Sequence, residues 1–138
     1  MLGRLIKNWF GQAREKRRKW LIARGFAAQS ADNLPLAIDL FDRAVAHDPA
    51  RADARCFLGN ALKLAGEHER AVVVLRTAVE AAPESIEAHL LLASVLPVPK
   101  CRDEAILALR YALDLGEDSV TLRRMALTLA IIDDRGVE

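Results

Sequence analysis

Residues 57–83 read FLGNALKLAGEHERAVVVLRTAVEAAP. Two stretches with apolar residues at helical spacing lie on either side of Gly66, and glycine is the residue that most often follows the end of a helix. Pro83 comes after the second stretch and stops it, because proline cannot continue a helix. The segment therefore predicts a helix, a tight turn and a second helix.

The same pattern occurs three times with a period of 34 residues, since segments 18–51, 52–85 and 86–119 align without a gap. The aligned columns share residue size: small residues stand where two helix backbones could approach closely, and large apolar residues stand between them. The small columns are Gly25, Gly59 and Ala93; Ala37, Ala71 and Ala105; and Ala44, Ala78 and Ala112, and the large ones are Phe41, Leu75 and Leu109; Ile38, Val72 and Ile106; and Val45, Val79 and Leu113.

Each segment thus predicts a helix pair. Asn33 and Pro35 suit the start of a second helix, and Pro97 and Pro99 should end the first helix of repeat three a turn early, which leaves Cys101 in a turn. The predicted first helices cover residues 19–31, 53–65 and 87–96, and the predicted second helices cover residues 35–47, 69–81 and 103–115.

These columns resemble the tetratricopeptide-repeat (TPR) family, whose unit is a helix-turn-helix of this length. The resemblance covers residues 18–119 and is greatest in repeat two. It implies a right-handed superhelix whose first helices line a concave groove that receives a peptide or a partner helix. We therefore predict an all-α, TPR-type solenoid of three repeats, with a basic amphipathic N-terminal helix at 1–17 and a C-terminal capping helix and tail at 120–138.

The resemblance also implies which residues line the groove. Asn60 is the best candidate to contact a peptide backbone, because its amide both donates and accepts hydrogen bonds. It is equally well explained as a common consensus residue. The predicted groove residues are Lys19, Ile22, Phe26, Gln29, Asp53, Cys56, Asn60, Lys63, Glu87, Leu90 and Ser94.

One subgroup of the family binds the C-terminal carboxylate of chaperones through a clamp of Lys, Arg and Asn. The matching positions of this chain hold no cation, so a carboxylate there would lack charge-assisted partners. We do not expect chaperone-tail binding of that kind. The matching residues are Ile22, Phe26, Phe57, Glu87 and Leu91.

The N-terminal helix has an apolar face opposite a polar, basic one. Three interpretations are open: a cap that packs on repeat one, an interfacial membrane helix, and a helix that binds a partner or a second copy of the chain. Trp20, in a column that otherwise holds alanine, favours the cap. The apolar face is formed by Leu2, Leu5, Ile6, Trp9 and Phe10.

Charge is divided unevenly along the chain. Residues 1–20 contain seven Lys or Arg and one Glu, a charge of +6, which leaves −5 for the rest of a chain whose net charge is +1. A basic segment of this kind favours an anionic partner: a membrane surface, nucleic acid or an acidic protein. We do not expect nucleic acid, because no known RNA- or DNA-binding motif accompanies it.

No catalytic pattern is visible, and we predict a protein that is not an enzyme and that has no cofactor or metal. The three histidines are isolated, so His89 is best explained by packing, and the two cysteines form no pair of the kind that binds zinc or forms disulfide frameworks.

The predicted function is a protein-protein interaction module, an adaptor or scaffold that binds a protein or peptide in the groove. The alternatives are a peripheral membrane assembly factor recruited through residues 1–20, and a small TPR chaperone of a secretion system. The predicted location is the cytoplasm, either free or at the periphery of a membrane.

Overall fold

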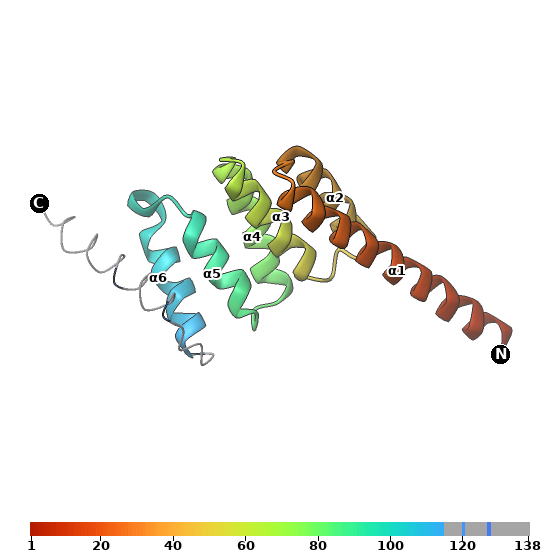
Figure 1. Cartoon of the computed structure of the whole chain (residues 1–138). Helices are drawn as coiled ribbons and strands as arrows, with labels where there is room; N and C mark the ends of the chain where they lie inside the picture. The colour runs from red at the N-terminus through yellow and green to blue at the C-terminus, as the bar shows by residue number, and fades with distance from the viewer. Residues whose placement is uncertain (115–119, 121–126, 128–138) are drawn as a thin grey trace, which may run out of the picture.

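The computed structural model describes residues 1–114 together with residues 120 and 127, and for residues 98–102, 112 and 113 it describes the backbone alone. The regular structure of the described residues is entirely α-helical, so the predicted all-α fold is confirmed. Figure 1 shows the helices following one another in a row between the two chain ends. They are α1 (Leu2–Ser30), α2 (Leu34–His47), α3 (Asp53–Leu64), α4 (His68–Ala81), α5 (Ile86–Val95) and α6 (Val98–Asp114).

The helices pack in consecutive pairs, α1 with α2, α3 with α4 and α5 with α6. Contacts of α2 with α3 and of α4 with α5 stack each pair on the next. The described part of the chain is therefore a short solenoid, in which each repeat buries its apolar face against its neighbours.

The helix exits of the first two repeats have the same geometry. Gly66 has a φ of 79°, and Glu67 donates its N–H to the Leu62 carbonyl, which satisfies a carbonyl at the end of α3. Asp32 stands one period earlier with a φ of 58°. The predicted turn at Gly66 is thus observed, and the residue in its column adopts the same left-handed conformation without being glycine.

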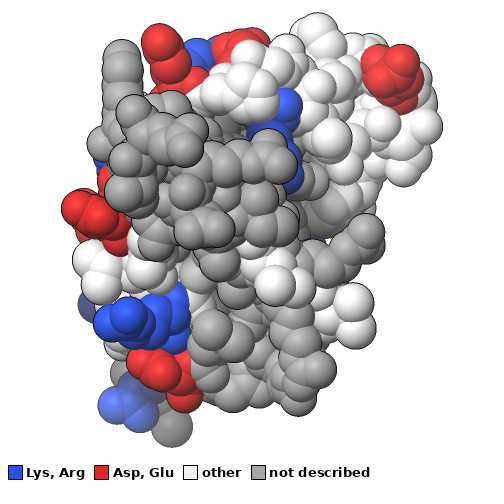
Figure 2. All heavy atoms as spheres, turned by 90° about the vertical axis from the view of Figure 1, so that its left-hand side faces the viewer, with Lys and Arg blue, Asp and Glu red and all other residues white. Residues whose placement is uncertain are grey.

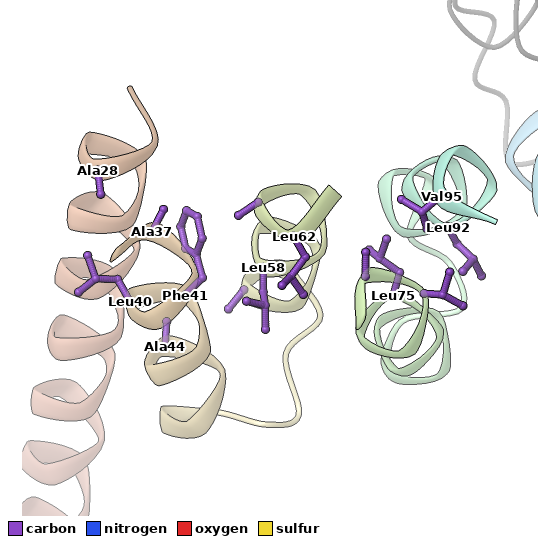
Figure 3. Close-up of a cluster of buried hydrophobic side chains, with 14 of the residues drawn as sticks. Ala28, Ala37, Leu40, Phe41, Ala44, Leu58, Leu62, Leu75, Leu92 and Val95 are labelled. Carbon is purple, nitrogen blue, oxygen red and sulfur yellow. The ribbon is translucent and has the colours of Figure 1, made fainter. Parts of the chain in front are cut away.

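Side chains from successive helices form one continuous core. Phe41, Leu62 and Leu75 are fully buried, and the alanines at 37 and 71 lie between the helices of their pairs. Figure 3 shows Phe41 on α2, Leu58 and Leu62 on α3, and Leu75 of α4 near Leu92 and Val95 of α5. The core therefore runs along the solenoid, as the apolar columns predict.

The glycine column marks the closest approach between paired helices. A Cβ atom on Gly25 would lie 2.5 Å from Cε1 of Phe41, and one on Gly59 would lie 2.5 Å from Cγ of Leu75. Neither position can hold a side chain unless the buried side chain of Phe41 or Leu75 shifts. Sequence columns correctly identified both positions.

Repeat three differs from the prediction. Helix α6 begins at Val98 rather than near residue 103, which places Cys101 inside the helix, so the predicted turn at Cys101 is wrong. Proline is tolerated in the first turn of a helix, where its missing N–H has no partner to lose, so Pro99 begins α6 instead of preceding it. The closing helix predicted from residue 120 lies outside the described residues, apart from positions 120 and 127.

Helix α1 is continuous through Gly11 and, with 29 residues, is more than twice as long as the other first helices, α3 with 12 and α5 with 10. Its N-terminal part, which we call the arm (residues 2–13), extends beyond the repeats (Figure 1), and all its residues are exposed. After the arm, Glu15 contacts Arg51 in the connection between α2 and α3, and Arg18 contacts Asp53 at the start of α3.

Candidate functional site

The predicted groove residues lie on α1, α3 and α5, which are neighbours. The Phe26 and Phe57 rings join α1 to α3, and α3 also contacts α5. We call the surface that these three helices share the first-helix face. Its half-buried or exposed members from the predicted set are Lys19, Ile22, Phe26, Gln29, Asp53, Asn60, Lys63, Glu87, Leu90 and Ser94.

An aromatic cluster forms the apolar centre of the first-helix face. The ring of Phe26 lies 4.8 Å from that of Phe57 and 5.3 Å from that of Phe41, both edge to face. Phe41 is fully buried, Phe57 is half-buried and Phe26 is 41% exposed. The three rings thus connect the core to the surface, and a ring of this size left exposed offers apolar area to a ligand.

Polar side chains lie beside this cluster. Asn60 is half-buried one turn after Phe57, and its amide makes no hydrogen bond among the described residues. At the other end of the face, the Ser94 hydroxyl donates to the Leu91 carbonyl at 2.7 Å, and Leu90 packs against Leu109 of α6. Asn60 therefore has free hydrogen-bonding groups, whereas Ser94 and Leu90 are engaged within the fold.

Cys56 does not line the first-helix face, contrary to the sequence prediction. It is 1% exposed and is enclosed by Ala78 of α4 and Ala88 of α5. Burial raises the pKa of its thiol to about 12, with smaller contributions from Glu87 and Asp53. The sequence missed this because the helical period does not tell which neighbouring helix covers a position.

An ion-pair network at the base of the arm was not predicted. Arg18, 3% exposed, donates to both carboxylate oxygens of Glu15 at 2.9 and 3.0 Å and to both oxygens of Asp53 at 2.9 and 3.0 Å. Arg51 lies 3.2 Å from Glu15 and 3.3 Å from Asp53. Asp53, expected to face a ligand, instead ties α3 to α1.

The ion pairs of this network shift the pKa values of Glu15 and Arg18 in the direction that favours their charged forms. The hydrogen bonds from Arg18 lower the pKa of Glu15 to about 2, and those from Glu15 and Asp53 raise the pKa of the Arg18 guanidinium above its usual range. The spacing of Glu15 and Arg18, three residues apart on one helix, was a signal for this pair. The partner on α3 could not be read from local sequence.

Comparison with known proteins agrees with this geometry. A family model described as tetratricopeptide repeat matches residues 28–95. The chain is a tetratricopeptide-repeat protein. No curated protein matches the sequence.

Solved TPR domains have a similar fold. The Sgt2 TPR domain from Aspergillus fumigatus has a TM-score of 0.79 at 22% identity, over 88% of this chain and 83% of that one. The Arabidopsis OM64 TPR domain has a TM-score of 0.78 at 18% identity, over 85% and 97%. The first TPR of Spaghetti (RPAP3), bound to the HSP90 peptide SRMEEVD, has a TM-score of 0.74 at 17% identity, over 83% and 94%.

In this TPR protein the positions that match the carboxylate clamp of the chaperone-binding subgroup are apolar or acidic. Ile22, Phe57 and Leu91 are half-buried and pack against the core, and Phe26 caps the aromatic cluster. Glu87 is exposed and carries negative charge. At these positions the first-helix face therefore has four apolar side chains and one carboxylate, in place of the Lys, Arg and Asn side chains of that clamp.

The arm does not pack on repeat one, so its interpretation as a cap is wrong. Trp9 and Phe10 are 64% and 59% exposed, and Leu2, Leu5 and Ile6 are exposed as well. Trp20 is also at the surface, where the guanidinium groups of Arg17 and Arg24 lie 4.9 and 5.5 Å from its ring. A tryptophan held between two arginines on the surface does not need a covering helix.

The described part of the TPR protein contains one buried histidine. His89 is buried, and its Nε2 lies 2.8 Å from the Pro83 carbonyl, to which it donates, with the ring beside Tyr111. This contact supports the expected structural role. Among the described residues no group of three His, Cys, Asp or Glu could hold a metal ion. None of the described helices is both long and apolar enough to cross a membrane.

Proposed function

We propose that this TPR protein is a non-catalytic interaction module that binds an apolar peptide segment or partner helix on the first-helix face. One observation supports this most strongly: Phe26 is 41% exposed above Phe57 and Phe41, on the face formed by α1 and α3. Burying such a ring under a partner is worth about 1 to 2 kcal/mol, because roughly half of its apolar surface is still in contact with water.

Polar groups around the cluster support a peptide rather than a purely lipidic ligand. A bound peptide must pair its backbone N–H and C=O groups, and the unbonded amide of Asn60 can serve both. Gln29 and Lys63 are half-buried on the same face. They supply further hydrogen-bond donors beside the apolar centre.

The charge on the face indicates which peptides fit. The solved TPR of similar fold binds the acidic peptide SRMEEVD. Here Glu87 and the apolar Ile22, Phe57 and Leu91 occupy positions of the clamp, so at these positions an acidic C-terminus would meet one carboxylate and no cation. We therefore propose a partner segment with an apolar anchor and without a terminal acidic cluster.

Peptide selection from a random displayed library on the full chain tests this proposal. We expect selected peptides to share a large apolar residue and to bind at least about tenfold more weakly to the Phe26→Glu, Asn60→Ala variant, because a charge would replace the apolar contact and the backbone would lose a partner.

Val73→Glu is the matched control, because Val73 is 62% exposed on α4, away from this face. It should bind the selected peptides as the wild type does. Peptides that bind the wild type and both variants equally would count against recognition by the first-helix face.

A further inference from the structure

The arm presents an apolar face that none of the described residues covers. In the second half of α1 the residues that face the repeats are Arg18, Leu21, Gly25 and Ala28. At about 100° per residue, the face formed by Leu2, Leu5, Ile6, Trp9 and Phe10 is turned by about 110° from that direction. Leu2, Leu5 and Trp9 therefore point away from the repeats, and Phe10 forms the edge of the face that is nearest to the repeat-facing side.

A further repeat stacked on the N-terminal side would cover only one edge of this face. In the arm, the direction that faces the repeats holds Gly3, Lys7 and Phe10, so Phe10 is the only large apolar side chain on that side. Trp20, 48% exposed, lies on the same side of α1 as Trp9. Basic side chains separate the two tryptophans on this outer side of α1, since Lys16 lies between them and Arg17 and Arg24 lie beside the Trp20 ring.

Charge separates this segment from the rest of the protein. Residues 1–20 carry +6, and their one carboxylate, Glu15, is already paired with Arg18 and Arg51. On the end of the molecule where α6 lies, the described charged side chains form small groups of both signs (Figure 2). Two arms of like charge would repel each other, so the charge favours an anionic occupant over a second copy.

We propose that the arm binds the surface of an anionic lipid bilayer, with its apolar face inserted among the lipids. A face of Leu, Ile, Trp and Phe next to Lys and Arg provides both apolar burial and attraction to anionic headgroups. The bilayer is favoured over nucleic acid because the aromatic rings share their face with aliphatic side chains, which would stay exposed on a phosphate backbone. The remainder of the chain, at −5, is repelled by the same surface and stays above it.

Tryptophan fluorescence of the full chain can report this binding directly, because the protein has two tryptophans and both lie on the outer side of α1. Vesicles of phosphatidylcholine with phosphatidylglycerol should shift the emission to shorter wavelength and co-sediment with the protein. Binding to vesicles of phosphatidylcholine alone should be weaker by about tenfold or more, because the attraction to anionic headgroups is lost. Added salt should weaken binding to the anionic vesicles by a similar factor, because it screens that attraction.

Phe10→Asp should weaken binding to the anionic vesicles by at least about tenfold, because it places a charge in the inserted face. Val73→Asp is its matched control, since Val73 has a similar exposure, 62% against 59%, but lies on α4. It should bind as the wild type does. Circular dichroism of both variants should match the wild type, because neither side chain is buried.

Three outcomes would overturn the proposal. The first is equal vesicle binding by wild type and Phe10→Asp. The second is a concentration-dependent dimer in sedimentation that Phe10→Asp abolishes, without vesicle binding, which would assign the arm to a second copy. The third is binding to a single-stranded oligonucleotide that is unaffected by Phe10→Asp and tighter than binding to vesicles.

Discussion

Small side chains decide how near the helices of a pair lie. The column of Gly25 and Gly59 could be recognised from sequence, because a period of 34 residues aligns them and their neighbours are large. The left-handed conformation of Asp32 was also within reach, since it stands in the column of Gly66. Aspartate tolerates this conformation better than most residues, which hides the turn from a search for glycine.

Cys56 shows where residue-level prediction fails. A helical period tells which residues share a face, but it does not tell which neighbouring helix covers that face. Cys56 aligns with Ile22, which is half-buried, yet Ala78 and Ala88 enclose Cys56. Its position had to be observed in three dimensions.

The thiol of Cys56 should be nearly inert in the folded protein. At pH 8 a pKa of about 12 leaves a thiolate fraction about a thousandfold below that of a free cysteine. In a Cys101→Ser background, labelling of Cys56 by a thiol reagent should therefore be slower than in denaturant by about that factor. Rapid labelling of the native protein at neutral pH would show that Cys56 is accessible after all.

At the scale of the helix, α1 joins the arm and one part of the first-helix face in a single continuous element. The presence of Gly11 does not by itself predict whether the N-terminal helix breaks there. Glycine costs about 1 kcal/mol in a helix, and neighbouring residues can offset this cost. In the structure α1 continues through Gly11, and the network of Glu15, Arg18 and Asp53 fixes its direction where it leaves the repeats.

This network should give the protein an acid-sensitive component of stability. The pKa of Glu15 is lowered from 4.5 to about 2, so the folded state holds the ionised form more tightly than the unfolded state does. The stabilisation is complete above the unfolded pKa of 4.5 and is lost as the pH falls through about 2. Wild type should therefore exceed Glu15→Gln in free energy of unfolding at pH 6, and the difference should shrink toward zero near pH 2.

Urea unfolding of both proteins across this pH range gives the measurement. Glu80→Gln removes an exposed carboxylate on α4 that has no ion pair among the described residues, and it controls for the loss of one surface charge. A difference between wild type and Glu15→Gln that stays constant from pH 6 to pH 2 would contradict the assigned pairing.

At the scale of the whole molecule, the repeat made the fold predictable. A period shared by many columns defines the helix pairs and their stacking, because each repeat contacts only its neighbours. The exposed aromatic cluster was only partly predictable: Phe26 was placed on the correct helix, but its contacts with Phe57 and Phe41 depend on how three helices meet. The base of the arm was missed because its ion pairs link residues more than thirty positions apart.

The central claim is that the first-helix face receives the partner, and amide chemical-shift mapping tests it most directly. The full chain, labelled with ¹⁵N, is titrated with a peptide selected as described above. The account predicts that the largest shift changes fall on α1 and α3 around Phe26, Phe57 and Asn60, and that they are lost in the Phe26→Glu, Asn60→Ala variant. Changes confined to α2 and α4, or to the arm, would contradict it.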